Sequence, residues 1–201
     1  MNDRLAALTT LAYGTPVEGG FFAGYIATPE GRFGIAVAPK AAGEIKGQWL
    51  PRYKAVPGAR STYDCRANTL AMAEAGSPIA KQILGLDING CTDWAVPSRD
   101  VLELLYRNLK PTTRQNICSF RDGDNASSIP IGYPYTKESP VQTLAEAFRE
   151  GGAEAFDPAW YWASTQYGDS SACLQDFVDG GQGFNVQRDT FLVRAVRRFK
   201  A

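Results

Sequence analysis

The chain has 201 residues, of which 44% are hydrophobic and 21% are charged, and these proportions predict one soluble domain with at most a small appendage. Its 21 Lys and Arg residues balance its 21 Asp and Glu residues, so a zero formal net charge gives no electrostatic reason to expect binding to nucleic acid or to an anionic membrane. The absence of histidine excludes Ser-His-Asp and Cys-His catalysis and every metal site that needs an imidazole.

The N-terminal residues do not have the pattern of an export signal. Asp3 stands where such a signal needs net positive charge, and the apolar stretch that follows is short. No apolar run reaches the ~18 residues of a membrane-spanning helix, so no membrane insertion is expected. Cys65, Cys91, Cys118 and Cys173 form no CxxC pair. Free thiols are expected, or one or two disulfides if the protein leaves the cell.

Residues 19–38 predict a β-hairpin. Aromatic and β-branched residues occupy both arms, and Pro29-Glu30-Gly31 between them is turn chemistry, because proline presets φ and glycine permits positive φ. Gly24 and Gly34 are small residues that favour close packing of another element on the hairpin. Residues 39–64 show little periodicity and are predicted to form a loop around Trp49.

Three helices are predicted in the middle of the chain. The first covers residues 66–75 and stops at Gly76. The second runs over residues 77–84, because Ser77 can cap it and a proline follows at its first position. The third is capped by Ser98 and ends at Pro111.

One broad face of the third helix is apolar, and Asp100 near its start favours the positive end of the helix dipole. Glu103 falls on the opposite face and is predicted to be a solvated charge.

The segment 111–157 has the features of an insertion between core elements. Residues 111–138 are rich in Asn, Asp, Ser, Gly and Pro and are predicted to be irregular. A fourth helix is expected from Ser139, with Pro140 at its first position and Gln142 completing a capping box, as far as Gly151.

The end of the chain is predicted to be β-structure. Strands are expected at residues 160–165, 172–178, 184–187 and 191–199, with a turn at Asp179-Gly180-Gly181. The last strand has apolar side chains on both faces, which indicates an interior strand. Strands at both ends and helices in the middle predict an α+β fold.

Four segments carry a family resemblance. They are Asp93-Trp94-Ala95-Val96-Pro97-Ser98 with the helix after it, Tyr161-Trp162-Ala163-Ser164-Thr165, residues 172–177, and Val193-Arg194-Ala195-Val196-Arg197. In this order they resemble the collagen-like-adhesin C-terminal family, over most of residues 90–199. The resemblance implies a C-type-lectin-like domain at 61–201, interrupted at 111–157. Residues 1–60, a hairpin and a loop, would then be a candidate region for docking to a phage tail.

The closing stretch, residues 162–199, resembles phage-encoded variable proteins of diversity-generating retroelements. In such proteins a fixed scaffold alternates with varied surface positions. The resemblance implies a set of ligand-binding positions, called here the display positions: Tyr167, Asp169, Ser170, Cys173, Leu174, Asp176, Val178, Gly181, Phe184, Asn185 and Gln187. Tyr, Ser, Asn, Asp and Gln prevail among them, a mixture typical of binding surfaces.

The function implied by this resemblance is a receptor-binding protein of a phage tail tip or tail fibre, carried in the virion, that is not an enzyme and uses no cofactor or metal. Its partners would be a host polysaccharide, pilus or outer-membrane protein and other tail proteins, and its assembly a homotrimer. The alternatives are a structural virion protein without ligand binding, and an oxidase of the formylglycine-generating type that uses Cys118 and Cys173 with copper.

Several residues allow a structural interpretation beside a functional one. Tyr167 is expected to contact ligand, whereas Phe184 either contacts ligand or packs on neighbouring strands. Trp94, Trp160 and Trp162 are expected in the core rather than on a sugar-stacking platform. The stretch 122–125, Asp-Gly-Asp-Asn, resembles the start of a calcium loop, but alanine stands at the fifth position, where the pattern needs Asp or Asn.

Overall fold

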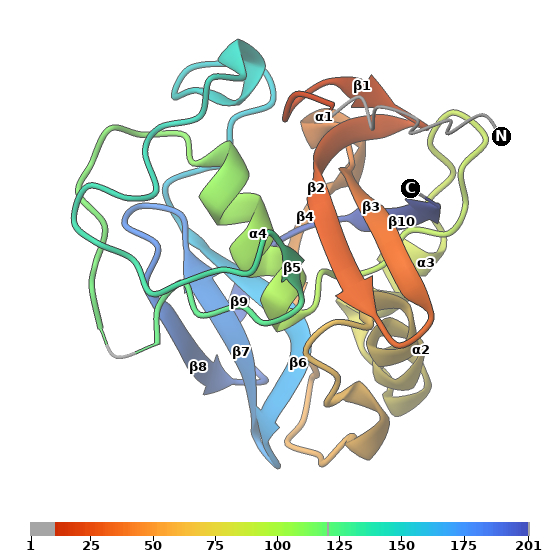
Figure 1. Ribbon diagram of the computed structural model, residues 1–201. Coiled ribbons are helices and arrows are strands. Elements are labelled where there is room, and N and C mark those ends of the chain that lie inside the picture. The colour runs from red at the N-terminus through yellow and green to blue at the C-terminus, as the bar shows by residue number, and fades with distance from the viewer. Residues whose placement is uncertain (1–10, 120, 201) are drawn as a thin grey trace, which may run out of the picture.

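The computed structural model describes residues 11–119 and 121–200 (Figure 1). These residues form two five-stranded sheets and four α-helices, which confirms the predicted α+β class. The first sheet has the order β1-β2-β3-β10, with β5 also paired to β2, and the second has the order β4-β9-β6-β7-β8. All pairs are antiparallel except β6 and β9, which are parallel.

The strands are β1 Pro16–Val17, β2 Gly20–Thr28, β3 Gly31–Val37, β4 Glu44–Gln48, β5 Ser128–Ile129, β6 Trp160–Gly168, β7 Ser171–Asp176, β8 Gln182–Val186, β9 Thr190–Arg194 and β10 Val196–Lys200. The helices are α1 Lys40–Gly43, α2 Cys65–Ala75, α3 Pro78–Leu84 and α4 Arg99–Leu109. Two short 3-10 helices are η1 Pro57–Ala59 and η2 Glu146–Phe148. Within the described ranges, no helix is long and apolar enough to cross a membrane.

The predicted hairpin is β2 and β3, and its other edge pairs with β10 near the end of the chain. Both small residues admit a close neighbour, as expected. Gly24 has a φ of 137° and lies against Leu104 and Asn108 of α4, and the Phe199 ring of β10 covers Gly34. Strand β4 likewise pairs with β9 in the second sheet. Residues 20–48 therefore contribute strands to both sheets, and in each sheet one of these strands pairs with a strand from the end of the chain.

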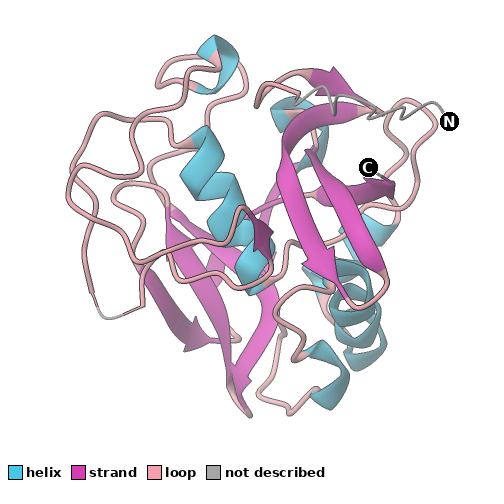
Figure 2. Cartoon of the chain, viewed as in Figure 1, coloured by secondary structure: helices cyan, strands magenta, loops and turns pink. Residues whose placement is uncertain are grey.

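The central strands of the second sheet, β6 and β7, are buried on both faces. On one face, Tyr161 and Phe177 pack in a core with α4, and that core continues to the first sheet. On the other face, Trp162 packs in a second core with Trp49 and with apolar residues of α2 and α3. In Figure 2 helix α4 crosses between the two sheets, and it contacts β2, β6 and β7. Strands β6 and β7 therefore form a frame covered on both sides.

The three predicted helices are confirmed as α2, α3 and α4. Ser77 caps α3 by accepting a hydrogen bond from the Ala80 amide, and Gly76 ends α2 with a φ of 103°. Ser98 precedes α4 but makes no capping hydrogen bond, because its hydroxyl oxygen accepts from the Cys65 thiol at 3.4 Å. Ser98 is therefore not the side-chain cap that the sequence predicts.

Three predictions of secondary structure are wrong. Residues 39–64 contain α1 and β4 as well as a loop, because β4 gains its hydrogen bonds from β9 and not from a local pattern. Residues 191–199 form two strands in different sheets, β9 and β10. The chain breaks at Ala195, whose amide and carbonyl bond to Gly43 and Ala38. The part in β9 is an interior strand, as predicted, since β4 and β6 flank it.

The fourth predicted helix does not form, and only η2 is helical in residues 139–151. The backbone has other partners here: the Thr143 amide donates to the Lys110 carbonyl at 2.9 Å, and the Gln142 side chain donates to the Pro111 carbonyl at 2.7 Å. Leu144 in this stretch is 86% exposed and packs in no core. The described residues between 111 and 138 are irregular, as predicted, apart from two-residue β5. Segment 111–157 forms the loops at the left of Figure 2.

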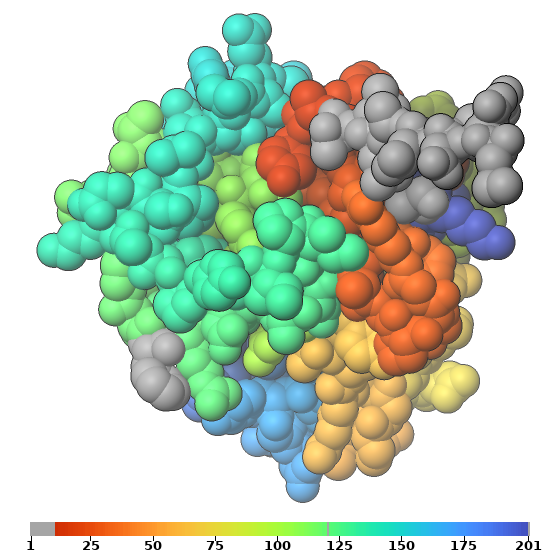
Figure 3. All heavy atoms as spheres, in the orientation of Figure 1, coloured from red at the N-terminus to blue at the C-terminus, as the bar shows by residue number. Residues whose placement is uncertain are grey.

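Glu103 is fully buried, so its prediction as a solvated charge is wrong. It accepts hydrogen bonds from Arg107 Nε at 2.9 Å, Tyr135 Oη at 2.8 Å and Asn125 Nδ2 at 2.6 Å. Burial raises the pKa of Tyr135 well above its usual value, and the Glu103 charge adds to this. The face of α4 that the sequence predicted to be exposed is covered, because segment 111–157, green to teal in Figure 3, lies over it. The Glu103 network thus fastens that segment to α4.

Candidate ligand-binding surface

Two aromatic rings stack on each other in solvent at one end of the second sheet. The rings of Tyr167 and Phe184 lie 4.0 Å apart between centroids with an interplanar angle of 6°, and the residues are 61% and 57% exposed. Tyr167 stands where the register between β6 and β7 shifts, and such an irregularity re-aims a side chain. Phe184 lies on the edge strand β8. Figure 1 shows the turn between β6 and β7 at the bottom of the molecule.

Polar side chains surround this aromatic pair. Asp169 and Ser170 form the exposed turn between β6 and β7. The Asp169 carboxylate accepts from Arg60 Nη2 at 2.9 Å, but both side chains are more than half exposed, so this ion pair adds little stability. Asp169 and Arg60 thus remain accessible for contacts with another molecule.

A loop from Leu50 to Val56 is fastened beside the aromatic pair by two buried glutamines. Gln166 accepts from the Val56 amide at 2.7 Å and donates to the Lys54 carbonyl at 2.9 Å. Gln187 accepts from the Lys54 amide and donates to the same carbonyl, both at 2.9 Å. These bonds hold the loop that carries Tyr53, which is 54% exposed and lies with its ring 5.6 Å from the Arg188 guanidinium.

These groups together form a region called here the tip surface. Its members are Tyr53, Arg60, Tyr167, Asp169, Ser170, Phe184, Asn185, Val186 and Arg188. All are exposed except Asn185, which is half-buried and accepts from the Val186 amide through its side chain at 2.7 Å. The tip surface therefore combines three aromatic rings with charges of both signs, and this mixture suits recognition of another molecule.

Four of the display positions are buried, so the prediction that they lie on the surface is wrong. They are Cys173, Leu174, Gly181 and Gln187. Cys173 belongs to the core around α4, whereas Leu174 belongs to the core on the opposite face of the sheet. Successive residues of a strand point to opposite faces, and here both faces are covered. Gln187 is occupied by the loop bonds described above.

The remaining display positions lie at or near the surface. Tyr167, Asp169, Ser170 and Phe184 are exposed, and Asp176, Val178 and Asn185 are half-buried. Asp176 accepts from the Val178 amide at 2.9 Å, and burial raises the pKa of its carboxyl. Asp176 therefore shapes the turn after β7 rather than extending into solvent.

Sequence reasoning missed Tyr53, Arg60, Val186 and Arg188. Tyr53 and Arg60 fall in residues 39–64, which lack a periodic pattern, and only Gln166 and Gln187 bring that loop to the end of the sheet. No local signal marks such a contact over more than 100 positions. Of these four residues only Tyr53 is aromatic, and its place in a proline- and glycine-rich segment is the one signal in the sequence that could have marked it.

The tryptophan prediction holds for Trp94 and Trp162, which are fully buried, while Trp160 is half-buried in the same core. Asp122 accepts from Ser119 Oγ at 2.7 Å and from the Gln182 amide at 3.0 Å, so its carboxylate holds two loops together. Among the described residues, no group of three or more Asp, Glu, Cys or His side chains is arranged to hold a metal ion.

All four cysteines are free. Burial raises the pKa of the Cys173 thiol to about 11, whereas Cys118 is exposed. Copper(I) binds thiolates, so the raised pKa disfavours the copper-binding role considered for Cys173.

The fold and the tip surface define a class: an α+β protein whose second sheet has central strands buried on both faces and presents exposed aromatic and charged side chains at one end. No protein-family model matches the chain, and no curated protein matches it either.

Proposed function

We propose that this protein is the receptor-binding module of a phage tail tip or tail fibre and that it recognises a host cell-surface molecule through the tip surface. The observation that supports the proposal best is the stacked pair of Tyr167 and Phe184, exposed on a frame that is buried on both faces. Burying two large rings on binding is favourable, and rings already ordered lose little conformational entropy.

The rigidity of the frame beneath the pair adds support. Many residues of the closing stretch that alternate with the display positions are buried, among them Trp162, Gln166, Ala172, Phe177 and Arg194. Arg194 donates to the Ala38 carbonyl at 2.6 Å and pairs with Glu154 at 2.6 Å. A backbone held in this way tolerates substitution at its exposed end, as interchangeable contacts require.

The proposal includes the finer points that the resemblance implies. The domain would have the C-type-lectin-like fold, act without catalysis and assemble with other tail proteins as a homotrimer. The ligand would be a polysaccharide, a pilus or an outer-membrane protein. Several copies on one particle would raise the avidity of individually modest contacts.

The test measures binding of the fluorescently labelled protein to cells of the bacterium that the phage infects, by flow cytometry over a concentration series. The double variant Tyr167→Ala, Phe184→Ala is compared with the unaltered chain. Each aromatic anchor contributes about 1–2 kcal/mol, and 1.4 kcal/mol is tenfold in affinity, so the apparent affinity is expected to fall at least tenfold.

The matched control is Tyr133→Ala, because Tyr133 is 77% exposed but lies outside the tip surface. It is expected to bind as well as the unaltered chain. Circular dichroism and thermal unfolding show whether each variant is folded. A folded double variant that binds host cells with unchanged affinity would overturn the proposal and favour the structural alternative, a rigid virion spacer.

A further inference from the structure

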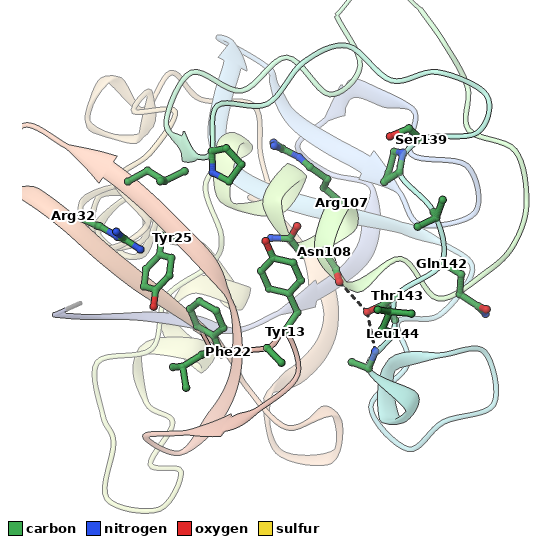
Figure 4. Close-up of a pocket in the computed structure, with 17 residues that line it drawn as sticks. Tyr13, Phe22, Tyr25, Arg32, Arg107, Asn108, Ser139, Gln142, Thr143 and Leu144 are labelled. Atoms are coloured by element: carbon green, nitrogen blue, oxygen red, sulfur yellow. Dashed lines mark hydrogen bonds between the residues drawn. The ribbon is translucent and has the colours of Figure 1, made fainter. Parts of the chain in front are cut away.

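A groove of about 760 Å³ lies apart from the tip surface, between the β2–β3 hairpin and residues 139–145 (Figure 4). Its volume is that of a pocket for a small molecule. Phe22 and Tyr25 of β2 form one wall, Val141 and Leu144 belong to the other, and Asn108 of α4 lies between them. None of these residues belongs to the tip surface, so the groove is a separate candidate site.

The lining of the groove is mainly apolar and aromatic. The rings of Phe22 and Tyr25 lie 4.8 Å apart, and the Tyr13 ring stacks on Phe22 at 6.0 Å. Across the groove, Val141 is 70% exposed and Leu144 is 86% exposed. Exposed apolar side chains gathered around a concave surface are typical of a binding site.

The charge of the groove is one-sided, because Arg32 and Arg107 are the only charged residues in its lining among those that the structure describes. Glu103 neutralises Arg107 through paired hydrogen bonds. Arg32 instead lies over the Tyr25 ring, with its guanidinium 3.8 Å from the centroid, and its Nε is shielded from solvent without a hydrogen-bond partner. Because Glu103 neutralises Arg107, Arg32 is the cation of the described lining that can pair with an anion supplied from outside.

The positions of these groups describe the shape of the ligand. Figure 4 shows Arg32 at one end of the groove, with Phe22 and Tyr13 between it and Leu144 on the opposite wall. A cation at one end of an elongated apolar channel complements a molecule with an anionic head and an apolar tail. We propose that the groove binds a long-chain carboxylate, whose head accepts hydrogen bonds from Arg32 and whose tail lies along Tyr13, Phe22 and Leu144.

The test is isothermal titration calorimetry of the full-length protein with sodium decanoate, below the concentration at which decanoate forms micelles. Saturable binding is expected. Arg32→Gln removes the charge, and because a hydrogen bond between charged partners is worth roughly ten- to a hundredfold in affinity, decanoate binding is expected to weaken at least tenfold. The neutral analogue decanol is expected to bind the unaltered chain and Arg32→Gln equally.

Two further variants complete the design. Arg188→Gln removes an exposed arginine of the tip surface and is expected to leave decanoate binding unchanged. Leu144→Glu places a negative charge beside the apolar tail of decanoate, and it is expected to weaken decanoate binding at least tenfold. Leu144 is 86% exposed, so this substitution should not affect folding. This second variant keeps the test informative if Arg32→Gln is unstable.

Three results would overturn the proposal. The first is an absence of saturable decanoate binding. The second is equal weakening by Arg32→Gln and Arg188→Gln. The third is tight binding of an acidic, leucine-rich peptide by a chain that does not bind decanoate, since the occupant would then be a protein segment.

Discussion

Replacing Glu103 with alanine is expected to destabilise the protein strongly and to free segment 111–157 from α4. The substitution removes a buried carboxylate that accepts from Arg107, Asn125 and Tyr135. Burial lowers the pKa of Arg107, but the hydrogen bond to Glu103 and the Glu103 charge together raise it above its usual value. In the variant Arg107 would remain charged, with a side chain only 19% exposed. The variant therefore leaves a poorly solvated cation without its counter-ion.

The size of the effect follows from these contacts. Removing one partner of a buried ion pair costs about 3–5 kcal/mol. The Tyr135 hydroxyl would also lose its acceptor, because Gln175 donates to it, and a buried unpaired donor costs about 1–3 kcal/mol. Asn125 keeps the Asp100 carbonyl at 2.7 Å. The contributions overlap, so we expect the free energy of unfolding to fall by about 4 kcal/mol in total.

The assay is urea unfolding at pH 7, followed by tryptophan fluorescence and extrapolated linearly to water. Glu103→Gln keeps the shape without the charge and is expected to cost about 1.5–3 kcal/mol. In Glu103→Ala, amide hydrogen exchange in residues 121–137 should accelerate relative to the unaltered chain, and by more than in the β2–β3 hairpin. Glu138→Ala, on an exposed residue of the same segment, is the control and should change stability by less than about 0.5 kcal/mol. A loss below about 1 kcal/mol for Glu103→Ala would refute this reasoning.

Two further predictions concern other buried groups. Arg194→Met removes a fully buried cation from the half-buried Glu44 and Glu154 and is expected to lower the free energy of unfolding by about 3–5 kcal/mol, measured by urea unfolding. Burial raises the pKa of the Cys65 and Cys173 thiols from 9.0 to about 11. Their folded-state pKa values lie above the unfolded ones, so the stability that they contribute is full below pH 9 and is lost as the pH rises toward 11. Urea unfolding between pH 8 and pH 10.5 should show a decline that is shallower in the variant Cys65→Ala, Cys173→Ala.

Matched variants separate these effects from general damage. Arg188→Met removes an exposed arginine and should leave stability within about 0.5 kcal/mol. The arginine prediction is wrong if Arg194→Met and Arg188→Met unfold at the same urea concentration. For the thiols, Cys118→Ala is the control because Cys118 is exposed. An equally steep decline in the double alanine variant would contradict the assignment to Cys65 and Cys173.

Elements whose stability depends on neighbouring residues could be predicted from the sequence. The β2–β3 hairpin follows its turn residues, and α3 follows Ser77 and the proline after it. The predicted fourth helix does not form, although Ser139 and Pro140 repeat the pattern of Ser77 and its proline. The Thr143 amide and the Gln142 side chain donate to the carbonyls of residues 110 and 111 instead. A local pattern therefore predicts structure only where no distant group competes for the same hydrogen bonds.

The binding surface shows the same limit. Tyr167, Asp169, Ser170 and Phe184 are exposed, as the resemblance implied, because they lie in a turn or on an edge strand. The surface predictions for Cys173, Leu174 and Gln187 were wrong, and Tyr53 was missed. Each of these outcomes depends on what packs against the sheet from far along the chain.

The amino-acid sequence by itself determined where most strands, turns and helices form, since glycine, proline, capping residues and apolar periodicity act within a few positions. Only the tertiary structure decided which polar residues are solvated. Glu103 appears free on an isolated helix and becomes the buried acceptor of Arg107, Asn125 and Tyr135 once segment 111–157 covers α4. Burial is a property of surfaces that meet in space, and helical periodicity specifies a face without specifying what covers it.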